Sequence, residues 1–183
     1  MKLAILLLSI PFLHAAETVI VFDAPQTKIG WSLGASLHTV HGTFQFRSGT
    51  VKFDRTTGKA SGSLVVNAVS GESGNSGRDE KMHKNILESP KFADIVFTPD
   101  RFEGKVPTEG KGTVKVHGAF QLHGVSHEIT LPFELDVQRN QINVASTFKI
   151  PYVSWGLKNP STFILRVNDN VDVDIRAVGN VLP

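Results

Sequence analysis

Apolar and polar residues alternate through most of this chain, and this period of two constrains the fold more than any other feature. Within residues 114–122 every second residue is apolar or glycine, and the alternation resumes over residues 129–137. Successive side chains of an extended strand point to opposite faces, so each segment predicts a strand with one buried face. The turn residues between them, 123–126, predict an antiparallel hairpin.

Shorter alternating segments continue the pattern on both sides of this hairpin. They predict further strands at residues 29–33, 43–47, 51–53, 64–69, 142–150 and 171–177. One segment, residues 78–89, breaks the period, because Met82, Ile86 and Leu87 fall at helical spacing among charged residues and Pro90 follows. This segment predicts one short amphipathic helix.

About eight antiparallel strands with a single helix leave two all-β architectures open, a lipocalin-like barrel and a sandwich. A barrel of this size can enclose a small ligand, whereas a sandwich would fill its core with side chains. A barrel that spans a membrane needs aromatic girdles at both membrane surfaces. One Tyr and two Trp are too few for two girdles, and the 12 Phe suit an interior better.

The first 16 residues predict a secretory signal peptide. Lys2 precedes an apolar run at residues 3–13, and the small residues Ala15 and Ala16 follow. At about 1.5 Å per residue this run forms a helix of roughly 16 Å, half of the ~30 Å hydrocarbon core, so no permanent membrane span is expected. We therefore expect a mature domain over residues 17–183 and a periplasmic or secreted location.

Charge and side-chain spacing exclude other partners. The formal net charge is +2 without a Lys/Arg cluster, so nucleic acid is not expected, and the absence of Cys removes disulfides and thiol chemistry. His38 and His41 lie three apart, which places them on opposite faces of a strand. His117 and His123 share a face but lie about 20 Å apart along an extended strand. Neither a metal nor a cofactor is expected.

A catalytic site is not expected either. Asp172 and Asp174 share a strand face, but alternating acids are typical of a solvated exterior. No Gly-flanked nucleophile elbow or glycine-rich oxyanion loop accompanies the Ser, His and Asp residues. We expect a protein that is not an enzyme.

Four segments, in order along the chain, resemble the YceI-like family. They are residues 40–54 (VHGTFQFRSGTVKFD), 77–99 (GRDEKMHKNILESPKFADIVFTP), 116–135 (VHGAFQLHGVSHEITLPFEL) and 167–179 (VNDNVDVDIRAVG). The resemblance implies an extended antiparallel barrel similar in fold to lipocalins. It also implies non-catalytic binding, storage or transport of an isoprenoid or another long-chain amphiphile in an elongated apolar cavity. Trp31 stands where the family more often has Phe, and His127 where Lys or Arg is more frequent.

Transfer energies favour the same function. Each CH2 moved out of water contributes about 0.8 kcal/mol, so a chain of about 16 carbons gains roughly 12 kcal/mol before ordering costs. We expect an aromatic cavity wall with Trp31 and Trp155 near its ends, and Arg78 at the mouth as a contact for a phosphate or carboxylate headgroup. The wall candidates are Phe44, Phe46, Phe53, Phe97, Phe120, Phe133 and Phe148.

Two functional classes remain open from the sequence. One is an isoprenoid-binding or fatty-chain-binding barrel, and the other is a structural or adhesive secreted β-sandwich with a filled core and no ligand. An internal cavity separates them. The helix face formed by Met82, Ile86 and Leu87, if exposed, would offer a contact for a homodimer.

Overall fold

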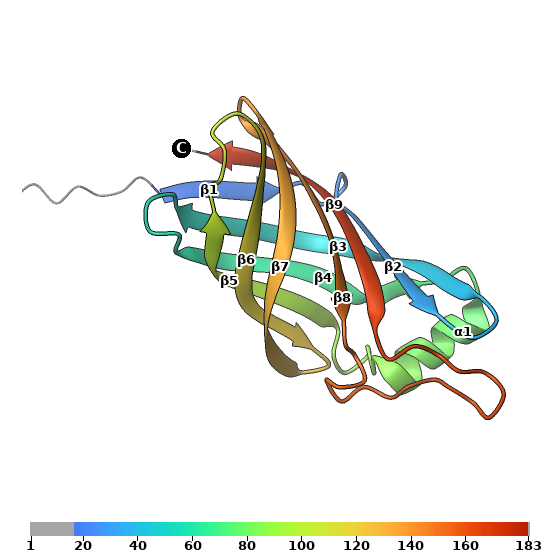
Figure 1. Ribbon diagram of the computed structural model, residues 1–183. Coiled ribbons are helices and arrows are strands. Elements are labelled where there is room, and N and C mark those ends of the chain that lie inside the picture. Colours follow the sequence, from blue (N-terminus) through green and yellow to red (C-terminus); the bar gives the residue numbers. More distant parts are fainter. Residues whose placement is uncertain (1–16, 183) are drawn as a thin grey trace, which may run out of the picture.

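The fold is a closed antiparallel β-barrel, seen in a computed structural model that describes residues 17–182 (Figure 1). The strands are β1 (Glu17–Phe22), β2 (Lys28–Gly34), β3 (Thr39–Asp54), β4 (Ala60–Glu72), β5 (Asp94–Gly104), β6 (Gly110–Leu122), β7 (Val125–Gln138), β8 (Gln141–Ile150) and β9 (Val171–Leu182). Their order in space is β1-β3-β2-β9-β8-β7-β6-β5-β4, and β4 pairs with β3 to close the wall. The signal peptide predicted at residues 1–16 lies outside the described residues.

β1 and β2 share one position in the wall. Both strands pair with β3 on one side and with β9 on the other, β1 near the chain ends and β2 further along. A turn separates them, in which the Asp23 carboxylate accepts a hydrogen bond from the Gln26 backbone N–H at 3.1 Å and the Asp23 carbonyl accepts one from Thr27 Oγ1 at 2.7 Å. The barrel therefore has eight wall positions, with β1 as an extra strand.

The predicted central hairpin is confirmed by the pairing of β6 with β7 along their full length. His123 and Gly124 both have positive φ, 53° and 78°, which is the conformation of a two-residue type I′ hairpin turn. The prediction of separate strands at residues 43–47 and 51–53 is wrong, because β3 is continuous. A register shift between Phe46 and Ser48 changes which alternate residues face the interior, from Phe44 and Phe46 to Val51 and Phe53, so the sequence pattern is interrupted within one strand. A single sheet closed on itself also excludes the β-sandwich alternative.

The ladder between β7 and β8 is short. It runs only from the pair Glu134–Ala145 to the pair Gln138–Gln141. It ends near Pro132, whose carbonyl accepts a hydrogen bond from Ser146 Oγ at 2.5 Å and whose ring nitrogen has no hydrogen to donate. β8 remains paired with β9 along its whole length.

The one short helix is confirmed, with shifted bounds. It consists of α1 (Ser76–Lys81) and a π-helical turn, η1 (Met82–Ile86). Asn75 caps its start, accepting a hydrogen bond from the Arg78 backbone N–H at 3.0 Å. Glu88, with a φ of 44°, follows its end. No helix within residues 17–182 is long and apolar enough to cross a membrane.

The two ends of the barrel differ. The start of β1 and the end of β9 lie at the same end of the barrel (Figure 1). We call it the packed end, because buried side chains fill the interior there. This core consists of Ile20, Phe53, Val114, Leu135, Val137, Ile142, Val144 and Ala177. At the opposite end, called the helix end, α1 lies beside the long β8–β9 loop, residues 151–170 (Figure 1).

Candidate functional site

The barrel encloses a cavity of about 950 Å³ between the packed end and the helix end. Every strand contributes to its lining, and alternate residues of a strand do so, as Ile29, Trp31 and Leu33 of β2 show. The period of two in the sequence is therefore the direct cause of a continuous apolar inner surface. This volume lies at the upper end of the range of about 300–1,000 Å³ typical of small-molecule sites.

Most of the aromatic wall candidates lie around this cavity. Those that line it are Trp31, Phe44, Phe46, Phe97, Phe120, Phe133 and Phe148. Phe97 of β5 and Phe120 of β6 are direct partners across the ladder, with ring centroids 6.4 Å apart. The barrel thus brings together side chains that are far apart in the sequence.

Two candidates lie elsewhere. Phe53 is only 4% exposed and sits in the packed end, where its ring meets Phe102 edge to face at 5.4 Å. It lines a second, smaller cavity of about 80 Å³. Trp155, in the β8–β9 loop, lies outside the lining and packs against Phe120 and His127, with ring centroids 5.6 and 4.2 Å away.

A floor of shared side chains separates the two cavities. Five residues line both, namely Phe22, Leu64, Phe97, Phe133 and Val144. They limit the depth of the large cavity from the helix end.

The mouth of the large cavity lies at the helix end and carries positive charge. Arg78 and Lys81 of α1 and Lys158 of the β8–β9 loop contribute to its lining, whereas no Asp or Glu of the described chain does. Ser73 fixes the Arg78 guanidinium, since Nε donates to Ser73 Oγ at 2.7 Å and Nη2 donates to Ser73 O at 2.8 Å. Arg78 thus lines the cavity, and its predicted contact with a headgroup stays a prediction.

Asp79 does not line the cavity, and its carboxylate accepts a hydrogen bond from Ser73 Oγ. Burial opposes its ionisation, but the hydrogen bonds from Ser73 and the charges of Arg78 and His83 outweigh burial and hold the pKa of Asp79 below its ordinary value. The Asp79 carboxylate therefore stays ionised and balances part of the charge of Arg78.

Several lining residues lie outside the predicted aromatic wall. Met82, Ile86 and Leu87 are half-buried and line the cavity, so the apolar helix face turns inward and does not form the exposed surface considered for a homodimer. Tyr152 and Leu157 reach the cavity from the β8–β9 loop. That loop has no periodic pattern, so nothing in the sequence indicated that it would line a cavity.

Trp31 provides one polar group in the apolar wall. Its side chain is buried, and its Nε1 has no hydrogen-bond partner within residues 17–182. The ring lies over Gly42, where any side chain would collide with it. A buried N–H without an acceptor is costly, so this donor is available to an oxygen of a bound molecule or to water.

Asp100, His117 and Glu128 form the one cluster of metal-ligand types found in the described chain, with candidate ligand atoms within 4.8 Å of one another. Asp100 Oδ1 lies 2.8 Å from His117 Nδ1, whereas Glu128 Oε2 lies 3.5 Å from Nε2, at the opposite edge of the ring. The Arg101 guanidinium also lies 2.8 Å from Nδ1. One ring nitrogen cannot share a metal with both carboxylates, and a cation already lies beside Nδ1, so this geometry does not favour a metal site.

Comparison with known proteins gives a consistent result. The sequence profile of the YceI-like domain matches residues 20–179. Three solved structures are similar: BcnA of Burkholderia cenocepacia, a polyisoprenoid binding domain from Saccharophagus degradans implicated in plant cell wall breakdown, and the YCEI protein of Campylobacter jejuni.

The likeness to these structures covers most of each chain. BcnA has a TM-score of 0.71 and 16% identity, over 86% of this chain and 98% of its own. The S. degradans domain has a TM-score of 0.67 and 15% identity, over 88% and 97%. The C. jejuni protein has a TM-score of 0.63 and 21% identity, over 77% and 84%. At identities this low, the structures establish a common fold.

Proposed function

Since this chain belongs to the YceI-like family, we propose that it is a non-catalytic binding protein that stores or transports a long-chain amphiphile, an isoprenoid or a fatty chain. The observation that carries the proposal is the apolar cavity of about 950 Å³ inside the barrel. The name of the S. degradans domain, which has the same fold, states polyisoprenoid binding and supports this ligand class.

The difference between the two barrel ends sets the orientation of the ligand. The hydrocarbon tail lies toward the floor, where the lining is apolar and each buried CH2 contributes about 0.8 kcal/mol. The polar headgroup lies at the helix end beside Arg78, the one long cationic side chain of the lining that Ser73 holds in place. Binding needs no covalent step, which agrees with a carrier rather than an enzyme.

We place this function in the periplasm or outside the cell. Support comes from the apolar run at residues 3–13 and the small residues that follow it. The intact mass of protein recovered from the periplasm tests this part of the proposal, because a protein that begins near residue 17 is expected.

The test of binding has two arms. Organic extraction of purified protein, followed by mass spectrometry, should identify a long-chain lipid. Delipidated protein should then melt at a higher temperature when a fatty acid or a polyprenol is added, because a ligand that binds only the folded state stabilises it.

Three variants sharpen the thermal test. Phe120→Glu places an unpaired charge in the apolar wall and should abolish the shift, and Leu33→Trp should do so by filling space without charge. Thr130→Glu, on the exposed outer face of β7, should leave the shift unchanged. Extracts without lipid, together with no shift for any chain, would refute the proposed function.

A further inference from the structure

We propose that the amphiphile is anionic, with a carboxylate or phosphate headgroup beside Arg78 that Lys81 and Lys158 also bind at the cavity mouth. This inference rests on the proposed function. Its basis is the charge of the lining: Arg78, Lys81 and Lys158 line the cavity, and no Asp or Glu within residues 17–182 does.

The two lysines line the cavity from different elements, Lys81 from α1 and Lys158 from the β8–β9 loop. Neither forms an ion pair with any acid of the described chain. Two acids of the same elements have other partners, since Asp79 accepts from Ser73 and Asp169 accepts from the Asn159 amide at 2.7 Å. An anionic headgroup would supply the missing negative charge, and hydrogen bonds to charged groups are stronger than neutral ones.

The experiment compares molecules that share a tail and differ in charge. A long-chain fatty acid should bind delipidated protein at least about tenfold more tightly than the alcohol of the same length, and added salt should reduce the difference. The Lys81→Gln/Lys158→Gln variant, in which Arg78 is intact, should lose most of this preference while keeping its affinity for the alcohol. Lys84→Gln/Lys91→Gln, at two exposed lysines outside the lining, is the matched control and should keep the preference.

The outcomes separate the two proposals. Equal affinity for acid and alcohol in the unmodified protein would overturn the anionic headgroup and leave the carrier function intact, whereas no binding of either would refute the carrier function itself. A short-chain acid of the same headgroup should not bind at these concentrations. Tight binding of the short acid would assign the lysines to a free anion and overturn the inference.

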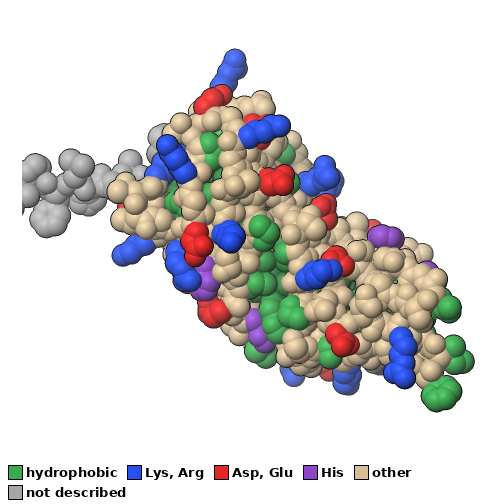
Figure 2. Space-filling model, in the orientation of Figure 1, with side chains coloured by type: hydrophobic (Ala, Val, Ile, Leu, Met, Phe, Trp, Pro, Cys, Tyr) green, Lys and Arg blue, Asp and Glu red, His purple; other side chains and the backbone are tan. Residues whose placement is uncertain are grey.

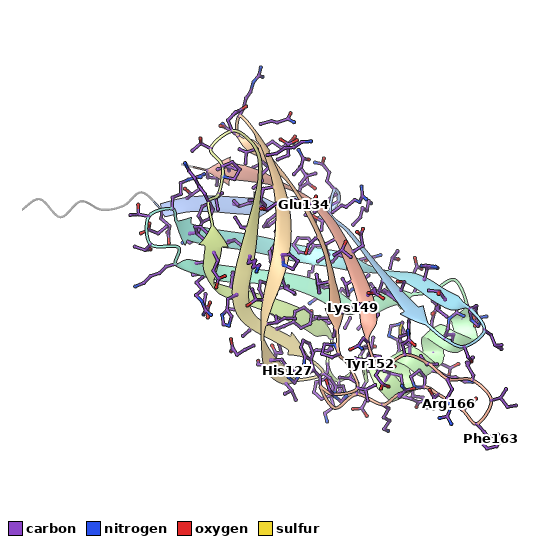
Figure 3. The ribbon with its side chains drawn as sticks, in the orientation of Figure 1. His127, Glu134, Lys149, Tyr152, Phe163 and Arg166 are labelled. Atoms are coloured by element: carbon purple, nitrogen blue, oxygen red, sulfur yellow. The ribbon has the colours of Figure 1, made fainter. Side chains whose placement is uncertain are left out.

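A second inference rests on a different observation, a group of exposed apolar side chains at the helix end. Phe163 is 99% exposed, Ile164 is 83% exposed and Leu37 is 76% exposed. We call these three residues the apolar tip. Figure 3 places Phe163 at the outermost point of the β8–β9 loop, and Figure 2 shows hydrophobic side chains protruding at this end.

The backbone holds the apolar tip outward. The turn that carries Phe163 and Ile164 is closed by hydrogen bonds from Thr162 N–H to Leu165 O at 2.8 Å and from Leu165 N–H to Thr162 Oγ1 at 3.1 Å. The residue before Leu37 is tied to the same loop, because Ser36 N–H donates to Arg166 O at 2.8 Å. Backbone hydrogen bonds therefore fix both the turn that carries Phe163 and Ile164 and the segment that precedes Leu37, and these side chains stay exposed.

We infer that the apolar tip docks into the surface of a lipid bilayer. Thr162 and Leu165, on either side of the exposed pair, line the cavity, so the tip borders the mouth through which a lipid must pass. Arg166 and Lys158 are exposed on the same loop, and such cations are attracted to anionic headgroups. Apolar side chains flanked by cations are typical of surfaces that insert into membrane interfaces.

Sedimentation with vesicles tests the docking. The protein should bind vesicles of phosphatidylglycerol and phosphatidylethanolamine, and Phe163→Ser/Ile164→Ser should lower the bound fraction about tenfold. Arg166→Gln should weaken binding to these vesicles more than to neutral phosphatidylcholine vesicles. Leu182→Ser, at an exposed apolar residue of the packed end, should change nothing.

If the unmodified protein binds neither kind of vesicle, the docking inference is overturned, and a protein partner is left as the molecule that covers the apolar tip. Equal losses in the tip variant and in Leu182→Ser would also overturn it. The tip variant should retain its melting temperature, because its side chains make no buried contacts.

Discussion

The rings of His127 and Trp155 lie face to face, with centroids 4.2 Å apart and planes parallel to within 1°. His127 belongs to β7, whereas Trp155 belongs to the β8–β9 loop, and Figure 3 shows His127 toward the helix end. Trp155 also contacts Phe120 of the cavity wall. This stack attaches the β8–β9 loop to the barrel directly behind the cavity lining.

Trp155→Ala should therefore destabilise the protein and loosen the loop. Trp155 is half-buried, so we expect a loss of about 2 kcal/mol, near half of the cost at a fully buried aromatic site. That corresponds to a fall in Tm of roughly 4–8 °C for a chain of this size. Thermal melts and limited proteolysis within residues 151–170 measure both effects. Phe163→Ala is the control in the same loop, and a comparable fall in its Tm would contradict the role of the stack.

Phe53→Ala and Phe44→Ala should differ in their cost, although both residues lie on the inner face of β3. Phe53 fills the packed end, so truncation should lower the free energy of unfolding by about 3–5 kcal/mol. Phe44 borders space that already exists, and its truncation should cost less. Urea denaturation of delipidated protein measures the two values. Equal losses would mean that the large cavity is filled by protein in solution.

Tyr152 should titrate far above an ordinary tyrosine. Burial, together with the negative charge of Asp169, raises its pKa from 10.0 to about 12, and its hydroxyl donates to Asn168 O at 2.8 Å. Because the folded pKa lies above the unfolded one, the stabilisation is fully present below the unfolded pKa and is lost as the pH rises through the folded pKa. The tyrosinate absorbance isolates this group, since the chain has one Tyr.

Circular dichroism of the same samples distinguishes this titration from alkaline unfolding, and denatured protein gives the reference value. A midpoint near the reference, measured while the barrel is still folded, would show that Tyr152 is open to water.

Phe97→Ala and Phe133→Ala should change the length of chain that the barrel accepts. Both residues belong to the floor between the large and the small cavity. Removing either ring should join the two spaces, so the chain length that gives the largest thermal shift should increase by several carbons. A series of fatty acids or polyprenols measures the optimum for each variant. Leu33→Ala, at the same cavity but away from the floor, should keep the original optimum.

The sequence predicts the faces of the strands better than their positions along the barrel. Alternation within residues 43–47 and 51–53 assigns Phe44 and Phe53 to the inner faces of two short strands, yet both belong to β3, where one lines the large cavity and the other fills the packed end. Depth along the barrel depends on the register between strands that are distant in sequence, and a period of two carries no information about it. The resemblance to the YceI-like family indicated an elongated barrel, but not which aromatic residues lie at which end.

The β8–β9 loop could not be predicted for a different reason. Tyr152, Leu157 and Trp155 lie in a segment without period, so their burial depends on contacts with β6, β7 and the cavity. The helix was predictable from the spacing of Met82 and Ile86, because these residues share one face of a turn of helix. The sequence does not show that this face points into the cavity, because its direction depends on how the helix packs over the cavity mouth.

The short ladder between β7 and β8 makes the barrel mechanically uneven. Beyond the pair Glu134–Ala145, strands β7 and β8 share no ladder hydrogen bond that would have to break for them to separate. Strands β8 and β9, in contrast, are paired at ten residues, so separating them would break a full ladder. The β4–β5 ladder is short as well, running only from the pair Leu64–Phe97 to the pair Asn67–Asp94, so the wall has two seams with few ladder hydrogen bonds. We therefore expect the width of the cavity to change more easily than its depth, which is limited by the five side chains of the floor.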